Sequence, residues 1–237
     1  MKPALRHEKW RLLRAPEDQS PICGLVFDID DTLYHDPAYH EAGTQGEVAE
    51  IAKILCRSHN ETALLIAERR QELKNELGRP VATTEIVLSL GVTRRQWNEL
   101  RCRAWHPEEW LIADIGICNM LLRLSGAYRI AFGTNSPVSL GRRVLDAIGI
   151  SAALPDIPVF GPESFSVSKP SPDFFARIAG ELGLTPDQCV SIGDREETDG
   201  VPAIMAGFGN ALIVFGGRRE IIKIVPKIFT RYKGDIE

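Results

Sequence analysis

Short apolar runs alternate with helical patterns through most of the chain. Residues 22–27, ICGLVF, form a nearly continuous apolar run, as expected for a strand buried on both faces. Similar runs recur at 128–132, 157–160, 189–192 and 211–215. Between them lie helical patterns with readable ends, such as the one opened by Pro172 and followed by Gly183. This alternation predicts an α/β fold with a Rossmann-like parallel sheet and helices on both faces.

The stretch from 38 to 106 breaks the alternation, because every segment in it has a helical pattern. Ser58 with Glu61, and Thr93 with Gln96, have the spacing of a capping box at a helix start. A crossover between two parallel strands needs only one helix, so this block is predicted to be an inserted α-helical domain. The predicted organisation is a core in two parts with the helical domain between them: residues 1–36 (1–20 as an N-terminal extension), 37–112 and 113–237.

Composition narrows the class of protein. Hydrophobic residues make up 44% and charged residues 25%, as in ordinary soluble globular proteins. The net charge of −4 gives no electrostatic footprint for nucleic acid or an anionic membrane, so neither is expected as a partner. No apolar run has the length of a membrane span, and the first twenty residues lack the apolar run of a signal peptide. The five cysteines show no C-x-x-C spacing, which favours reduced thiols and a cytoplasmic protein.

Polar and charged residues follow the ends of successive predicted strands. Each alone is also typical of a turn, a helix cap or a solvated loop. Their order along the chain is more informative than any single residue, because ligands of open α/β sheets bind at the carboxyl ends of the strands. In chain order the groups are Asp28 and Asp30, Thr134 and Asn135, Lys169, and Asp194 with Asp199.

Electrostatics explains why these groups belong together. Converging carboxylates repel each other unless a cation lies between them, and all-oxygen ligands suit Mg²⁺. Lys169 adds a positive charge, and the helix that starts near Ser136 offers amide groups to an anion. Such a place suits a phosphoryl group. One carboxylate can attack it to form an aspartyl-phosphate, and a second, two residues away, can protonate the leaving oxygen and later activate water.

The chain thus carries four ordered segments: Asp28-Ile29-Asp30-Asp31-Thr32-Leu33, Thr134-Asn135, Lys169-Pro170, and Gly193-Asp194 with Asp199. Together they resemble the motifs of the haloacid dehalogenase-like superfamily of phosphohydrolases, over about residues 22–215. The helical insertion is similar to the cap domain of that family, which closes over the site and shapes the choice of substrate. The resemblance implies a capped phosphatase that acts on a small phosphorylated metabolite.

The resemblance also implies roles for individual residues. Asp28 would be the nucleophile and Asp30 the general acid and base. Thr134 and Lys169 would hold the phosphoryl oxygens, with Asn135 assisting. We therefore expect a hydrolase that cleaves a small phosphomonoester through an aspartyl-phosphate intermediate.

A magnesium site is implied by the same resemblance. Its ligands would be Asp28, the main-chain carbonyl of Asp30, and Asp194, with Asp199 as a further ligand, direct or through water. One position departs from the pattern, since Asp31 stands where many members have glycine. The departure is mild, because acidic and amide residues also occur there.

Two other functions are compatible with this fold. A 2-haloacid dehalogenase uses the same nucleophilic aspartate without Mg²⁺ and lacks the second acid of the first motif, so Asp30, Asp194 and Asp199 disfavour it. A non-catalytic module that binds a phosphorylated ligand is the other alternative. Such a module is expected to have lost one of the acids or the lysine, and none is missing here.

The insertion offers weaker signals. Its arginines are interpreted as solvated helix faces rather than as a substrate pocket: Arg69, Arg70, Arg94, Arg95, Arg101 and Arg103. Trp97, Leu100 and Ala104 have ordinary core spacing. Tyr34 and His35 follow the first motif directly, and His35 is either a contact to the leaving group or a hinge residue.

Overall fold

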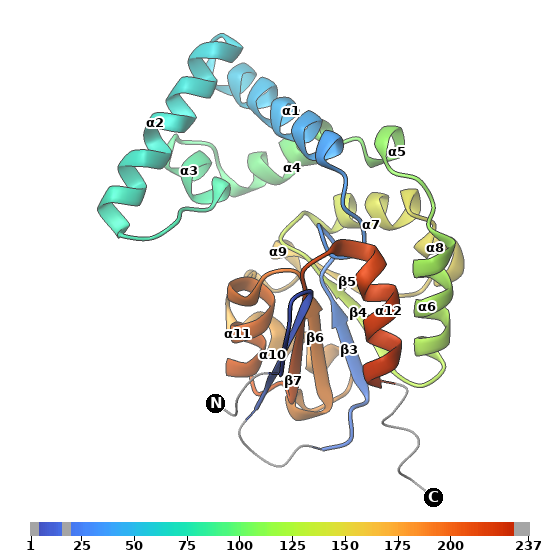
Figure 1. Cartoon of the computed structure of the whole chain (residues 1–237). Coiled ribbons are helices and arrows are strands. Elements are labelled where there is room, and N and C mark those ends of the chain that lie inside the picture. The colour runs from blue at the N-terminus through green and yellow to red at the C-terminus, as the bar shows by residue number, and fades with distance from the viewer. Residues whose placement is uncertain (1–4, 16–19, 230–237) are drawn as a thin grey trace, which may run out of the picture. The chain divides into compact units, whose positions relative to one another are not determined.

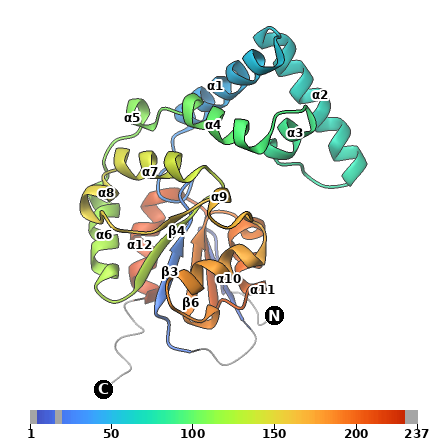
Figure 2. The same cartoon turned by 180° about the vertical axis from the view of Figure 1, so that it is seen from behind.

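The computed structural model describes residues 5–15 and 20–229 (Figures 1 and 2). The chain forms two compact units. The first consists of Met1–Asp36 and Leu111–Glu237, and the second of Pro37–Trp110. The second unit is therefore inserted into the first between two strands of its sheet.

A seven-stranded sheet forms the centre of the first unit, in the order β1-β2-β7-β6-β3-β4-β5. Strand β3 pairs in parallel with both β4 and β6, and β5 and β7 continue the parallel sheet on either side. The bounds are β1 Leu5–His7, β2 Trp10–Arg14, β3 Gly24–Phe27, β4 Arg129–Gly133, β5 Val159–Phe160, β6 Cys189–Gly193 and β7 Asn210–Val214. The predicted α/β fold with a parallel core sheet is confirmed.

Helices cover both faces of this sheet. Helices α10 and α11 lie on one face, and α6 and α12 on the other (Figures 1 and 2). The apolar stripe of α10 is buried against the sheet, with Phe174, Phe175 and Ile178 each at most 1% exposed. The helical elements of the unit are α6 Ile115–Ser125, α7 Val138–Ala147, α8 Ile150–Ala153, α9 Pro162–Phe165, α10 Pro172–Glu181, η1 Pro186–Gln188, η2 Glu196–Gly200, α11 Val201–Met205 and α12 Gly217–Phe229.

The N-terminal extension turns out to be part of the sheet. Strands β1 and β2 form an antiparallel hairpin, and β2 pairs antiparallel with β7, Leu12 lying opposite Leu212. Leu12 and Leu13 are buried. The extension therefore lengthens the sheet by two strands. Residues 1–4 and 16–19 of the extension lie outside the described residues.

The inserted unit is built from helices alone, as the pattern predicted. They are α1 Pro37–Leu55, α2 His59–Leu77, α3 Thr83–Ser89, α4 Arg94–Ala104 and α5 Pro107–Trp110. The expected capping boxes are present at Ser58 before α2 and at Thr93 before α4. Trp97 and Leu100 belong to the apolar core of the unit, which confirms their predicted core positions. Among the described residues, none of the helices combines the length and apolar character needed to span a bilayer.

One polar cluster in the inserted unit is buried. Glu47 is 7% exposed and accepts hydrogen bonds from Nε of Arg101 at 3.0 Å and from Nε1 of Trp105 at 2.7 Å. Burial raises the pKa of Glu47, and the nearby Arg101 charge offsets part of that effect. The expectation of solvated arginines thus holds for Arg95, whose side chain is 88% exposed, and is wrong for Arg101.

Candidate active site

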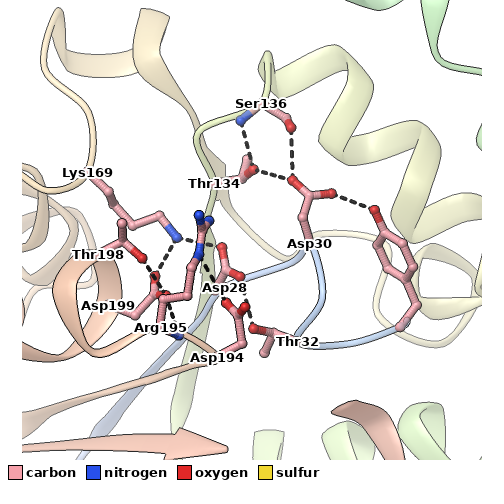
Figure 3. A network of polar contacts seen from close by, with 11 residues as sticks. Asp28, Asp30, Thr32, Thr134, Ser136, Lys169, Asp194, Arg195, Thr198 and Asp199 are labelled. Atoms are coloured by element: carbon pink, nitrogen blue, oxygen red, sulfur yellow. Dashed lines mark hydrogen bonds and ion pairs between the residues drawn. The ribbon is translucent and has the colours of Figure 1, made fainter. Parts of the chain in front are cut away.

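The carboxyl ends of the central strands bring the predicted polar groups to one edge of the sheet. Asp28 directly follows β3, Thr134 follows β4, and Asp194 follows β6. Because β3 lies between β4 and β6, Asp28 occupies the middle of this edge, and its amide donates a hydrogen bond to the carbonyl of Ile192 at 2.8 Å. Parallel pairing of three neighbouring strands thus assembles the site. Figure 3 shows the side chains of Asp28, Thr134 and Asp194 close to one another.

Three carboxylates form a tight cluster there. One oxygen each from Asp28, Asp194 and Asp199 lies within 4.8 Å of the others. Asp199 comes from η2, a single π-helical turn, and packs against the end of β6. A Cβ atom at Gly193 would lie 2.5 Å from the Asp199 carboxyl carbon, so only glycine allows this approach.

Lys169 connects two of the buried acids. Its Nζ lies 2.5 Å from Oδ1 of Asp28 and 2.6 Å from Oδ1 of Asp199, and its side chain is 1% exposed. Burial alone would lower the pKa of this lysine, but the charges of Asp199 and Asp28 outweigh burial and raise it. The lysine is therefore held in its charged form inside the cluster.

Burial has the opposite consequence for the acids. It raises the pKa of Asp28 to about 7, although the charge of Lys169 acts against it. It also raises the pKa of Asp194 to about 6, with a further contribution from the charges of Asp199 and Asp31. One lysine thus compensates only part of the negative charge that three ionised carboxylates would bring together.

The donor set fits a hard divalent cation. All three clustered ligand groups are carboxylates, the oxygen donors that Mg²⁺ prefers. Oδ1 of Asp194 is buried and accepts no hydrogen bond from any described residue, and the nearest cation is Nε of Arg195 at 3.7 Å. A bound cation would satisfy this oxygen and favour the ionised forms of Asp28 and Asp194.

Asp30 belongs to a different network. Its Oδ1 accepts a hydrogen bond from the Tyr34 hydroxyl at 2.7 Å. Its Oδ2 accepts from Oγ of Ser136 at 2.9 Å and from Oγ1 of Thr134 at 3.3 Å (Figure 3). The side chain of Asp30 is therefore held by hydroxyl donors and is not one of the three clustered carboxylates. The metal ligand predicted at this residue was its main-chain carbonyl.

The remaining predicted residues lie outside the acid cluster. Thr134 is fully buried, and its Oγ1 also accepts a hydrogen bond from the amide of Ser136 at 2.9 Å. Asn135 is half-buried in the same loop, and its contact with a phosphoryl oxygen stays a prediction. His35 is exposed, and its Nδ1 lies 2.8 Å from Oδ1 of Asp31.

Several residues of the site were not predicted from the sequence. Thr32 donates a hydrogen bond to Oδ2 of Asp28 at 2.9 Å, and Thr198 donates to Oδ2 of Asp199 at 2.9 Å. Each is a hydroxyl within four residues of a predicted acid, and that spacing is the signal that could have found it. The sequence marks Ser136 only as the start of a helix, although its side chain donates a hydrogen bond to Asp30.

The backbone explains the one departure from the motif pattern. Asp31 has a φ of 61°, in the left-handed region that favours glycine. Aspartate is among the few other residues that tolerate this region, because its short polar side chain can form local hydrogen bonds. The position therefore constrains backbone shape, and Asp31 satisfies the constraint.

The chain is similar in sequence to known hydrolases. A family model described as haloacid dehalogenase-like hydrolase matches residues 23–207. The N-acylneuraminate-9-phosphatase of Mus musculus is 25% identical over 206 residues, which are 79% of this chain and 80% of that protein.

Solved structures share the fold. A HAD phosphatase from Thermococcus onnurineus has a TM-score of 0.60 at 19% identity, and the alignment covers 87% of this chain and 97% of that one. A hydrolase from Pseudomonas syringae has a TM-score of 0.55 at 17% identity, covering 87% of this chain and 99% of that one.

Proposed function

The chain belongs to the haloacid dehalogenase-like hydrolase family, and from that premise we propose that it is a Mg²⁺-dependent phosphatase. It would hydrolyse a small phosphomonoester through an aspartyl-phosphate at Asp28. The observation that carries the proposal is the combination of two networks. Asp28 shares a buried cluster with Lys169 and two further acids, and Asp30 is held apart from them by hydroxyl groups.

The first half-reaction uses both aspartates of the first motif. An oxygen of Asp28 forms a bond to phosphorus while the ester bond to the leaving group breaks. Asp30 gives its proton to the departing oxygen and becomes a carboxylate. Lys169 and the hydroxyl of Thr134 hold the phosphoryl oxygens, with Asn135 assisting.

The second half-reaction reverses the role of Asp30. Its carboxylate takes a proton from a water molecule, and the water oxygen forms a bond to phosphorus as the bond to Asp28 breaks. Phosphate leaves, and Asp28 is regenerated. Asp28, Asp194 and the main-chain carbonyl of Asp30 would hold Mg²⁺, with Asp199 as a further ligand, direct or through water. The cation would supply positive charge that offsets the charge of the transferring group.

The same residues favour this function over its alternatives. A dehalogenase has no use for three clustered carboxylates or for a second acid such as Asp30. A module that had lost catalysis would not need a nucleophile, an acid and a lysine all in place. These features support a working phosphatase.

The relative and the insertion support a choice of substrate class. The name of the mouse relative identifies a phosphorylated N-acylneuraminate as the substrate of that protein, so phosphorylated sugars and sugar acids come first in a substrate panel. We assign residues 37–112 to the cap that selects among them. A cytoplasmic location would supply such metabolites and keep the five free thiols reduced.

Phosphate release from p-nitrophenyl phosphate and from the sugar phosphate panel tests the proposal. Asp28→Asn should lower kcat by at least about a thousandfold, because it removes the nucleophile. Addition of EDTA should have a comparable effect, because it removes the cation. The matched control is Asp146→Asn, an exposed aspartate on α7, which should retain wild-type activity.

Two outcomes would contradict the proposal. Full activity of Asp28→Asn would exclude the aspartyl-phosphate. Halide release from a 2-haloacid in EDTA, without phosphate release from any ester, would replace the phosphatase by a dehalogenase.

A further inference from the structure

The hydroxyl network around Asp30 carries an inference that rests on the proposed function. We propose that Tyr34 is a positioning residue for Asp30. Its hydroxyl fixes the acid and base carboxylate in place and stabilises the charge that Asp30 acquires when it gives up its proton. Its contribution should therefore grow with the demand of the leaving group for that proton.

The geometry supports this role at both ends of the carboxyl group. Tyr34 is 2% exposed, and its hydroxyl lies 2.7 Å from Oδ1 of Asp30. Ser136 holds Oδ2 at 2.9 Å, and Thr134 makes the longest of the three hydrogen bonds, at 3.3 Å. Of the described residues, Tyr34 is the one whose side chain donates a hydrogen bond to Oδ1. Without it, the carboxyl group is held from one side only.

The proton transfer explains why this hydrogen bond matters for rate. As Asp28 forms its bond to phosphorus, the ester bond breaks and its electron pair stays on the leaving oxygen. That oxygen takes the proton of Asp30, and the electrons of the O–H bond remain on Asp30 as carboxylate charge. A hydrogen bond to an ionised acceptor is roughly twice as strong as one between neutral groups. Tyr34 therefore stabilises the transition state more than the ground state, which is the condition for accelerating the reaction.

Leaving groups differ in how much they need this proton. A nitro-substituted phenol is acidic enough to depart as the phenolate, whereas phenol itself is a weaker acid and benefits from protonation. The loss caused by removing the Tyr34 hydroxyl should rise along this series. A tyrosine that only filled space in the core would affect all the esters equally.

The experiment measures kcat/KM for a series of substituted phenyl phosphates with the full chain and Mg²⁺. This constant reports the steps up to transfer of the phosphoryl group to Asp28. Tyr34→Phe keeps the buried ring and removes the hydroxyl. We expect a loss of less than about twofold for the most acidic leaving group and of about tenfold for phenol.

Tyr128→Phe is the matched control. Tyr128 is also buried and also donates through its hydroxyl, but its acceptor is the carbonyl of Phe229 at the end of α12, at 2.6 Å. Removal of the Tyr128 hydroxyl should change kcat/KM by less than about twofold for every ester.

A second comparison separates action through Asp30 from any other effect. In an Asp30→Asn background, adding Tyr34→Phe should cause no further loss, because the group it positions has no proton to transfer. Additive losses, or equal losses across the ester series, would overturn the inference while leaving the phosphatase intact. A wild-type protein that releases phosphate from none of the esters would overturn the proposed function, and the role of Tyr34 with it.

Discussion

At the scale of single residues, the acid cluster is governed by the balance between burial and charge. Asp28 is 6% exposed and Asp199 1%, so ionising both would be costly without Lys169 between them. Even with the lysine in place, the pKa of Asp28 is about 7 and that of Asp194 about 6. Without a cation, these two carboxyls therefore bind protons more strongly than an exposed aspartate does.

This competition predicts a pH-dependent affinity for Mg²⁺. The cation binds the ionised carboxylates, so below these pKa values it must displace protons from Asp28 and then also from Asp194. The affinity should be constant above about pH 8, fall by roughly tenfold per pH unit between 7 and 6, and fall more steeply below 6. Calorimetric titration with Mg²⁺ at several pH values below and above 7 measures this affinity.

Proton release provides the control for that experiment. At each pH, the titration is repeated in buffers of different ionisation enthalpy, which reveals the number of protons released on Mg²⁺ binding. Protons should be released near pH 6 and none near pH 8. Equal affinity at both pH values would mean that the acids are already ionised without the cation.

The sequence predicted the members of the acid cluster but not the hydroxyls around it. Asp28 and Asp194 follow strands that the apolar runs mark clearly, and parallel pairing brings their ends together. The hydroxyl of Ser136 reaches Asp30 from another segment, 106 residues away in sequence. No local pattern encodes such a contact, because it depends on how the loop after β4 turns over the sheet edge.

At the scale of elements, the hydrophobic pattern did not predict the hairpin β1-β2. Strand β2 reads WRLLR, with arginines on both sides of two leucines, and so lacks the continuous apolar run of β3. It lies beside β7 near the edge of the sheet, where charged side chains can reach solvent. Arg11 uses this position to form an ion pair with Glu196 of η2.

The hairpin therefore supports the turn that carries Asp199, and its removal should weaken the fold. Leu13 is 2% exposed, and its Cδ1 would lie 2.9 Å from a Cβ atom at Gly200, the last residue of η2. Leu13→Ala should lower the free energy of unfolding by about 2–4 kcal/mol, as truncation of a buried leucine does. Urea denaturation followed by circular dichroism measures the free energy of unfolding of the variant and of the wild type.

The neighbouring residue supplies the control. Arg14 is exposed on the same strand, and Arg14→Ala should change the free energy of unfolding by less than about 0.5 kcal/mol. A Leu13→Ala protein as stable as the wild type would show that β2 adds nothing to the stability of the sheet.

At the scale of the whole molecule, two compact units have separate cores. The helical pattern predicted the inserted unit, including its capping boxes and the core positions of Trp97 and Leu100. It did not predict the buried pair of Glu47 and Arg101, which are 54 residues apart and come from α1 and α4. The periodicity of apolar residues identifies the helix face that must be buried, but it does not identify the charged residues that are buried beside that face.

That pair should matter for the inserted unit and leave the sheet unaffected. Glu47→Gln removes the carboxylate charge that faces Arg101, whose side chain is 16% exposed. We expect a loss of about 1.5–3 kcal/mol in the local stability of 37–110, since the hydrogen bonds from Arg101 and Trp105 then end on a neutral amide instead of a carboxylate. Hydrogen exchange should accelerate in α1 and α4 and stay unchanged in β3 and β6.

An exposed pair on the same helix is the control. On α4, Nε of Arg95 lies 2.8 Å from Oε1 of Glu99, and the two side chains are 88% and 50% exposed. Glu99→Gln should lower the local stability by less than about 1 kcal/mol. Faster exchange throughout both units in Glu47→Gln would mean that they unfold together.

Gly193 has a consequence for how this protein can change over generations. The space beside its Cα is filled by the carboxyl carbon of Asp199, so any amino acid encoded there displaces one of the clustered acids. A missense mutation in this codon is therefore a change in the acid cluster, whichever amino acid it introduces. The glycine carries no functional group, yet a lineage that replaces it must rebuild the position of Asp199 or give up the cluster.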